Sequence, residues 1–294
     1  MKIPSVTIKQ LLEAGVHLGH KTFRWNPKME KFIFGSKESI HIIDLVQTLE
    51  LIKASLQEIN KCISSGGKIL FVSTKKQASD AICSLAKNTS QYYVNHRWLG
   101  GMLTNWKTIS NSIKRYKKLN EDLKKENTGF TKKEILKMGI QRDKLERSLG
   151  GIADMKKIPD MIFIIDTNIE SLAVKEAQKL NIPIVAIVDT NSDPTGINFP
   201  IPGNDDARRA INLYCELIEK TISDVQKNKT IEEKIETSEE VKSDKEKIKS
   251  KKIDSPKNKK TTLAKDKKEN EESIKDKSIS ILSKIKNIAS KKTK

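Results

Sequence analysis

The sequence predicts an α/β protein built on a Rossmann-like parallel sheet covered by helices on both faces. Three short, continuously apolar runs predict strands, at 68–73, 160–166 and 183–189. Helical patterns separate these runs, and apolar strands joined through helices are typical of parallel sheets with right-handed crossovers. A long helical interruption between the first two runs predicts an inserted antiparallel helical coiled-coil hairpin, and the lysine-rich end of the chain predicts a disordered C-terminal tail.

The first part of the chain is expected to hold short elements. Residues 5–14 have the pattern of a short helix that ends at Gly15, and residues 17–30 are expected to be irregular. The short apolar or alternating segments at 31–36 and 40–43 indicate strands.

A long helix is expected next, with Asp44 as its cap. Its leucines and isoleucines recur every three or four residues up to Gly67, which indicates one buried face. The strand at 68–73 is followed by a helix at about 75–88 and a short strand at 92–94. This succession is typical of a parallel sheet.

Two helical segments with an apolar seam predict the hairpin. The first begins after Thr104, a plausible N-cap, and the second ends at Gly150 and Gly151, with a turn at 127–129 between them. The seam residues are Trp106, Ile109, Ile113, Tyr116 and Leu123 on the first arm and Ile135, Met138, Leu145, Leu149 and Ile152 on the second. Two such arms are too narrow to bury a core alone, so we expect them to project from the body.

The second half is expected to complete the sheet. A helix at 169–180 lies between two of the apolar strands, and a polar loop with several prolines follows the last one. Asn204 is then expected to cap a final helix, with Asp205 and Asp206 in its first turn. The expected units are 1–103 and 152–226 for the two parts of the α/β domain, 104–151 for the hairpin and 227–294 for the tail.

The charge indicates the kind of partner. The net charge of +18 divides equally between residues 1–226 and 227–294, and all seven arginines lie in the first part. A basic excess in both parts predicts a polyanionic partner. Three widely separated cysteines indicate a reducing compartment, and no apolar run approaches the roughly 18 residues needed to span a bilayer. We therefore expect a cytoplasmic protein without a membrane partner.

The segment from Asn95 to Lys107 is the most unusual in the chain. It combines two tryptophans, two adjacent glycines and cationic side chains. Cations can pair with phosphates and flat rings can stack on bases, although tryptophans are also common core anchors. The candidate RNA-binding residues here are Asn95, His96, Arg97, Trp98, Asn105 and Lys107.

Two further segments carry basic candidates. The irregular N-terminal segment contributes Lys21, Arg24, Trp25, Asn26 and Lys28, and the outer face of the hairpin contributes Lys114, Arg115, Lys117 and Lys118. Helix lysines are often only a solvated surface. The second arm of the hairpin carries a further basic cluster, Lys132, Lys133, Lys144 and Arg147, and two basic clusters on one projecting arm of a basic protein favour phosphate contact. The pair His17 and His20 lacks a nearby carboxylate or thiol in sequence, so it makes a weak metal site.

Several long strings in one order also resemble a known family. The string from Asn95 to Trp106, NHRWLGGMLTNW, is similar to the signature of small-subunit ribosomal protein two in its bacterial form. Four other segments are similar to the same family, namely 15–20 running into 25–29, 40–45, 187–194 and 201–206. The resemblance spans roughly residues 3 to 222, and the lysine-rich extension beyond it departs from the family.

This resemblance implies a structural constituent of the small ribosomal subunit. Its expected partners are 16S-type rRNA and neighbouring ribosomal proteins, including the large mRNA-binding protein one, which the family helps to dock. No cofactor and no small-molecule substrate are implied. The ribosome would be cytoplasmic, with an organellar one left open.

The alternative is a metal-dependent enzyme. Doubly wound sheets often bind ligands at the carboxyl ends of their strands, and a carboxylate cluster there could hold Mg²⁺ for phosphoryl transfer or nucleotide binding. Asp189, Asp205 and Asp206 are the weak metal candidates. The turn after Ser73 has no glycine-rich phosphate loop, and no nucleophile stands beside a histidine in sequence. We therefore expect no catalysis.

Overall fold

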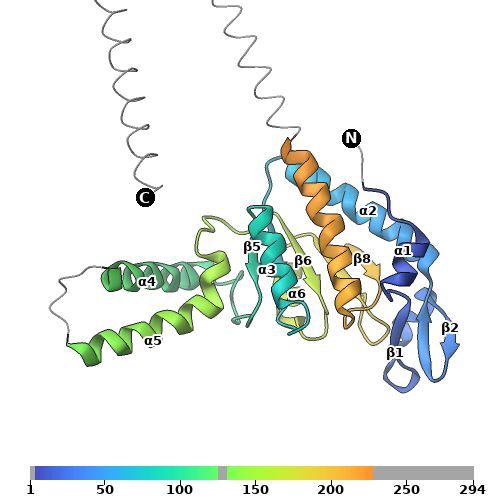
Figure 1. The fold of residues 1–294 in the computed structure, drawn as a ribbon, viewed down its shortest axis with the longest axis horizontal. Helices are drawn as coiled ribbons and strands as arrows, with labels where there is room; N and C mark the ends of the chain where they lie inside the picture. The colour runs from blue at the N-terminus through green and yellow to red at the C-terminus, as the bar shows by residue number, and fades with distance from the viewer. Residues whose placement is uncertain (1–3, 125–130, 228–294) are drawn as a thin grey trace, which may run out of the picture. The chain divides into compact units, whose positions relative to one another are not determined.

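The computed structural model describes residues 4–124 and 131–227, and these form an α/β fold with two sheets (Figure 1). The larger sheet is fully parallel, in the order β5-β4-β6-β7-β8. Its strands are β4 (Ile69–Val72), β5 (Tyr92–Val94), β6 (Met161–Ile165), β7 (Ile184–Val188) and β8 (Phe199–Pro202). The predicted parallel sheet is thus confirmed, while the predicted turn at 127–129 and the tail beyond Lys227 lie outside the described residues.

The helices follow the predicted order. They are α1 (Ile8–Glu13), α2 (Leu45–Ser64), α3 (Ser79–Asn88), α4 (Trp106–Lys124), α5 (Lys132–Leu149), α6 (Ser171–Lys179) and a helix at 208–227. Asp44 caps α2 as predicted, since its Oδ1 accepts from the Val46 N–H at 2.9 Å. None of the helices in the described ranges is both long and apolar enough to cross a membrane.

Strand alternation divides the core between the two faces of the parallel sheet. Phe71 and Phe163 point to one face, where α2, α3 and the helix at 208–227 cover them. Leu70 and Ile162 point to the other face, against α6, the base of the hairpin and the segment around Trp98. Both faces are buried because successive side chains of a strand point in opposite directions.

The N-terminal segment is more ordered than the sequence predicts. Residues 17–30, expected to be irregular, contain β1 (Leu18–Lys21), the 3₁₀ helix η1 (Thr22–Arg24) and the start of a second one, η2 (Pro27–Phe32). β1 joins β2 (Ile33–Lys37) and β3 (Ile40–Ile43) in an antiparallel sheet of order β1-β3-β2. Its sequence, Leu-Gly-His-Lys, lacks the apolar alternation that predicts a strand. The segment is a strand because it pairs with β3, and not because one of its faces is buried.

The last strand, β8, also differs from the prediction. β8 lies in the stretch expected to be a proline-containing loop, and it pairs with β7 at the edge of the sheet. Pro200 and Pro202 cannot donate backbone hydrogen bonds, and an edge strand is where a sheet tolerates that loss.

The predicted hairpin is present, with α4 and α5 side by side and extending away from the sheet (Figure 1). Ile109, Ile113 and Leu149 bury the part of its seam nearest the body. Ile135, expected on the seam, is 43% exposed. Where the hairpin returns to the body, a Cβ on Gly151 would lie 2.1 Å from the Tyr93 carbonyl oxygen, so only glycine fits there.

Candidate functional site

One buried carboxylate organises the Asn95–Lys107 segment. Oε1 of Glu176, on α6, accepts hydrogen bonds from Trp98 Nε1 at 3.1 Å and the Gly101 N–H at 2.8 Å. Oε2 accepts from the N–H groups of Leu103 and Thr104 at 2.9 and 3.1 Å and from the Thr104 hydroxyl at 3.2 Å. Burial raises the pKa of Glu176, but these donors outweigh that effect and lower the pKa below its usual value. The segment is therefore fixed by an anion from a distant part of the chain.

The hydrogen bonds to Glu176 determine how far the ring of Trp98 is exposed. Trp98 is only 7% exposed and packs in the core beside Met102 and Leu103, so its ring is not available for base stacking. Thr104, predicted to cap the next helix, instead donates to Glu176, and α4 begins at Trp106. The core-anchor interpretation of Trp98 therefore describes this structure, and Trp98 does not join the RNA interface proposed below.

Some polar side chains of the same segment are hydrogen-bonded within the protein, and others are exposed. Asn95 donates to the Ser79 hydroxyl at 3.3 Å, and Asn105 accepts from the Thr108 hydroxyl at 2.9 Å. His96, Arg97 and Lys107 are exposed. The segment therefore presents its cations outward, while Trp98 packs in the core and Trp106 is half-buried.

The cations of α4 separate into free and engaged groups. Lys117 pairs with Asp154 at 3.0 Å, and Arg115 donates to Gln141 of α5 at 3.5 Å. Three exposed lysines, Lys107, Lys114 and Lys118, have no carboxylate partner within the described ranges. Their spacings of seven and four residues place them on one face of the helix, where they form what we call the α4 lysine stripe.

The N-terminal candidates also divide in this way. Lys28 pairs with Asp193 at 2.7 Å, which, with the Thr195 hydroxyl, lowers the pKa of Asp193 to about 2. Asn26 accepts from the Lys28 N–H at 3.0 Å and so caps η2. Trp25 packs against His41, with ring centroids 5.4 Å apart. Lys21 and Arg24 are exposed and pair with no carboxylate among residues 4–124 and 131–227.

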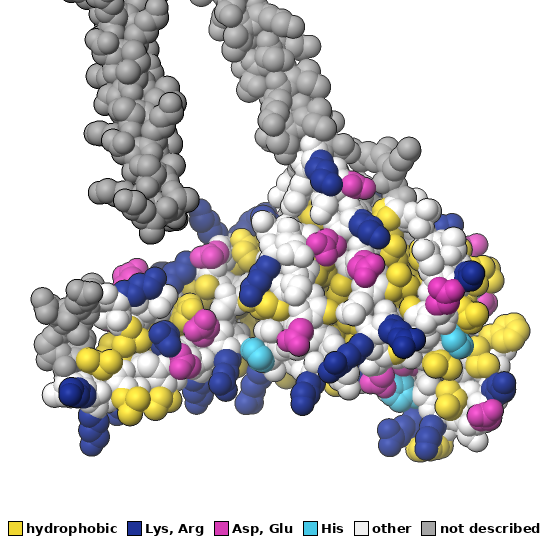
Figure 2. Space-filling model, in the orientation of Figure 1, with side chains coloured by type: hydrophobic (Ala, Val, Ile, Leu, Met, Phe, Trp, Pro, Cys, Tyr) yellow, Lys and Arg dark blue, Asp and Glu magenta, His cyan; other side chains and the backbone are white. Residues whose placement is uncertain are grey.

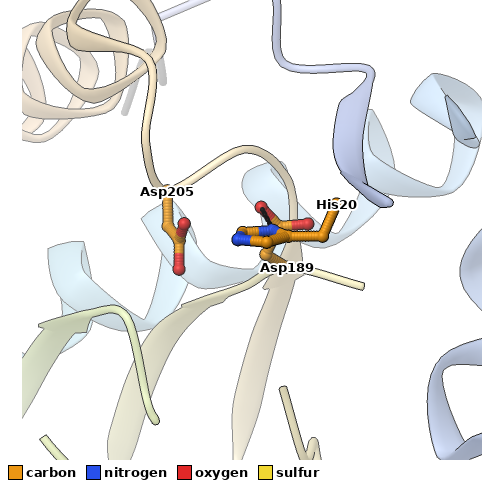
Figure 3. A group of neighbouring side chains, drawn as sticks. All are labelled: His20, Asp189 and Asp205. Carbon is orange, nitrogen blue, oxygen red and sulfur yellow. Dashed lines mark hydrogen bonds and ion pairs between the residues drawn. The ribbon is translucent and has the colours of Figure 1, made fainter. Parts of the chain in front are cut away.

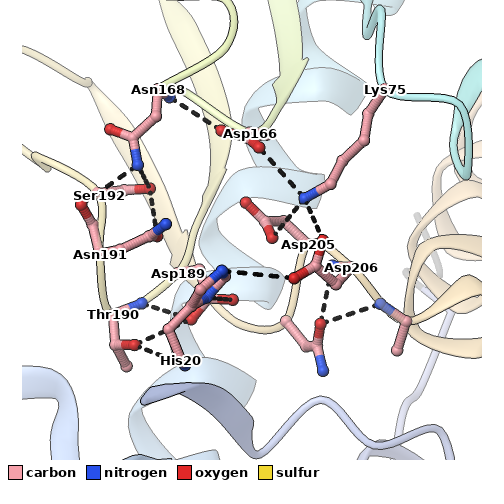
Figure 4. A network of polar contacts seen from close by, with 12 residues as sticks. His20, Lys75, Asp166, Asn168, Asp189, Thr190, Asn191, Ser192, Asp205 and Asp206 are labelled. Carbon is pink, nitrogen blue, oxygen red and sulfur yellow. Dashed lines mark hydrogen bonds and ion pairs between the residues drawn. The ribbon is translucent and has the colours of Figure 1, made fainter. Parts of the chain in front are cut away.

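A buried polar cluster lies at the carboxyl ends of the parallel strands (Figure 4). Nζ of Lys75 lies 3.2 Å from Asp166, 2.9 Å from Asp205 and 2.6 Å from Asp206. Burial alone would lower the pKa of Lys75, but hydrogen bonds to Asp205 and Asp206 raise it above its usual value. The lysine is thus held charged among carboxylates, two of which, Asp205 and Asp206, are weak metal candidates from the sequence.

His20 completes this cluster from β1 (Figure 3). Its Nδ1 lies 3.0 Å from Asp189 Oδ2, and its Nε2 lies 3.4 Å from Asp206 Oδ2. The hydrogen bond to Asp189 raises the pKa of His20 despite partial burial. Ligand atoms of His20, Asp189 and Asp205 lie within 4.8 Å of one another, an arrangement that could hold a divalent cation. The sequence indicates His20 only as half of a weak metal-site pair with His17, because its carboxylate partners lie far away in the chain.

Excess negative charge is the other property of the cluster. Asp166, Asp189 and Asp205 are each no more than 5% exposed; Lys75 pairs with Asp166 and Asp205, and His20 lies against Asp189. Burial, followed by the charges of Asp189 and Asp166, raises the pKa of Asp205. Its Oδ2 has no hydrogen-bond partner in the structure described. Side chains arranged in this way can distribute negative charge among several carboxylates and can bind a cation. The cluster also connects β1 of the antiparallel N-terminal sheet to the ends of the parallel strands.

The exposed cations without carboxylate partners in the described ranges indicate the class of protein. They lie on exposed loops and on a projecting helix, and Figure 2 shows Lys and Arg side chains along one edge of the hairpin and the adjoining body. A basic surface of this kind on a rigid α/β body is the electrostatic footprint of a protein that binds a polyanion such as RNA.

Comparison with known proteins identifies the family. The family model described as Ribosomal protein S2 matches residues 11–225. Small ribosomal subunit protein uS2 of Parvibaculum lavamentivorans and that of Sinorhizobium medicae are each 58% identical over 224 residues, 76% of this chain and 88% of the relative. The Brucella suis protein of the same name is 57% identical over the same shares. The chain belongs to the ribosomal protein S2 family.

Membership confirms the resemblance predicted from the sequence. The chain is a structural, non-enzymatic component of the small subunit of the cytoplasmic ribosome and acts in translation, with rRNA and ribosomal proteins as its partners. The phosphoryl-transfer alternative is therefore set aside.

Proposed function

We propose that this protein contacts small-subunit rRNA through the α4 lysine stripe. The observation that carries the proposal is that Lys117 is ion-paired and Arg115 hydrogen-bonded, while the other α4 lysines are exposed and unpaired within the described residues. Three of these, Lys107, Lys114 and Lys118, share a single face of the helix, and Lys124 lies on another. Unpaired lysines on a rigid helix can meet phosphates at helical spacing, and each acts as a point charge.

Other exposed cations extend this proposed interface. Arg97 lies in the segment held by Glu176, Lys21 is the last residue of β1 in the N-terminal sheet, and Arg24 ends η1. His96, Asn95 and Asn105 are polar neighbours that can reach sugar or base edges. Lys28 is paired with Asp193, so we assign it to the fold rather than to RNA.

The test is the salt dependence of binding to small-subunit rRNA. Each lost phosphate contact lowers the slope of log affinity against log salt by about 0.7–0.9. Replacing Lys107, Lys114 and Lys118 together by alanine is expected to lower the slope by about two to three. A matched triple, with the exposed Lys53, Lys179 and Lys220 replaced, removes the same charge elsewhere. Equal slopes for the two triples would refute the proposal.

The organisation around this interface is part of the proposal. Residues 1–103 and 152–226 would make one α/β domain, with 104–151 as an inserted hairpin and 227–294 as a separate tail. Support comes from the adjacent strands β4 and β6, which lie on either side of the insertion in sequence. Replacing 110–148 by a short linker should leave a cooperative urea unfolding transition, and loss of that transition would contradict these boundaries.

We further propose that the N-terminal sheet helps to dock the mRNA-binding protein one of the small subunit. Phe34 of β2 is 79% exposed and Phe23 of η1 is 73% exposed, and aromatic side chains are favoured anchors at protein interfaces. Phe34→Ala is expected to reduce the amount of protein one retained on purified small subunits about tenfold or more. Leu172→Ala, at a 54% exposed position on α6, is the control. Equal retention with both variants would exclude Phe34.

A further inference from the structure

A groove lies between α5 and the loop that precedes α4. The loop contributes His96, Arg97 and Leu99 to its lining, and α5 contributes Ile140, Lys144 and Arg147. Its volume is about 530 Å³. We call it the α5 groove, and it is distinct from the α4 lysine stripe.

α5 carries apolar residues on more than one face. Leu145 and Leu149 pack toward the core at the hairpin base. Leu136 and Ile140 are 68% and 62% exposed, four residues apart, and the same face continues through Lys144. An amphipathic helix normally keeps its outer face polar, so a second apolar face indicates a surface that another molecule covers.

The rim of the groove is positive. Arg97, Lys144 and Arg147 form no ion pair within the described ranges. The acidic lining residue, Asp143, is paired with Arg142 at 2.5 Å and is therefore offset locally. An apolar floor with unpaired cations at its edge is complementary to a ligand that carries an apolar group flanked by negative charges.

We propose that the α5 groove binds an acidic segment of a neighbouring protein, with an apolar side chain against Leu99 and Ile140 and carboxylates beside Lys144 and Arg147. RNA supplies the negative charge, and a base could stack on His96 or Arg97 of the lining, but RNA offers little apolar surface to cover Leu136 and Ile140, so an acidic protein segment is the better fit. This inference goes beyond the proposed rRNA contact, and His96 and Arg97 are the residues common to both.

Photocrosslinking in purified small subunits tests the ligand directly. The full chain is assembled with benzoylphenylalanine in place of Ile140 or, as the matched control, in place of Lys137, which is exposed on α5 but does not line the groove. We expect position 140 to crosslink to a protein peptide with at least two Asp or Glu within about five residues, and position 137 to give at most a tenth of that yield. Crosslinking to RNA, to a peptide without acidic residues or to nothing would overturn the proposal.

Charge reversal then tests the recognition itself. Lys144→Glu should lower the crosslink yield from position 140 at least fivefold, and Lys137→Glu, the same change outside the groove, should leave it unchanged. Because the two variants place the same charge on one helix, a general loss of folding would affect both. An equal yield in both variants would refute the electrostatic part of the proposal, whereas the salt slope of the α4 lysine stripe depends on neither residue.

Discussion

Replacing Glu176 by glutamine tests whether one carboxylate holds the Asn95–Lys107 segment. Trp98 and Gly101 donate to one carboxylate oxygen, and Leu103 and Thr104 donate to the other. An amide keeps one acceptor and turns two N–H groups toward donors, so at least two of these hydrogen bonds are lost whichever way it rotates. At about 1–3 kcal/mol for each unsatisfied buried group, Glu176→Gln should lower the free energy of unfolding by about 2–5 kcal/mol.

Urea unfolding of the purified chain measures this loss. Lys175→Gln changes an exposed neighbour on the same helix and should stay within about 0.5 kcal/mol of the unchanged protein. The pKa of Glu176 is lowered by folding, so its contribution is present above the usual glutamate pKa and disappears as the pH falls through the folded value. The gap between Glu176→Gln and the unchanged protein should therefore narrow below about pH 4.5. A gap under 0.5 kcal/mol at pH 7 would refute the anchoring role.

Two other substitutions follow from the same geometry. His20→Gln should destabilise the protein more at about pH 5.5 than at pH 8.5 in urea unfolding, because the pKa of His20 is raised by Asp189 and its stabilisation is full below about 6.5 and lost as the pH rises through the folded value. An equal loss at both pH values would contradict this pairing. Gly151→Ala should cost about 3 kcal/mol or more, since its methyl group would overlap the Tyr93 carbonyl. Gly139→Ala, with open space around it inside α5, should instead stabilise by about 0.5–1 kcal/mol, and thermal unfolding distinguishes the two.

The sequence predicts those elements whose own residues specify them. The apolar strands β4, β6 and β7 are recognisable because both of their faces are buried, and α2 is recognisable from its cap and its single apolar face. β1 and β8 are not, since a polar four-residue strand and a proline-rich edge strand depend on pairing partners elsewhere in the chain.

The candidate sites follow the same rule. Exposure of Arg97 and Lys107 agrees with local sequence, while burial of Trp98 depends on Glu176, which no local pattern connects to it. The meeting of His20 with Asp189 likewise depends on how two sheets pack. Local sequence also cannot identify the unpaired cations of α4, because their partners lie on other elements. Asp154 engages Lys117, and Gln141 engages Arg115.

The long sequence separation between these hydrogen-bonding partners has a consequence for the synthesis of the protein. Glu176 lies 73 residues after Leu103, and Asp189 lies 169 residues after His20. Translation releases the N-terminal half first, so the loop and the histidine leave the exit tunnel long before their acceptors exist. The loop cannot reach its final geometry until α6 emerges, and His20 cannot do so until the end of β7 emerges, so a chain arrested before Glu176 would present this segment without its anchor. The hydrogen bonds that hold the Asn95–Lys107 segment therefore form only after α6 has been synthesised, and the His20 contact only after β7.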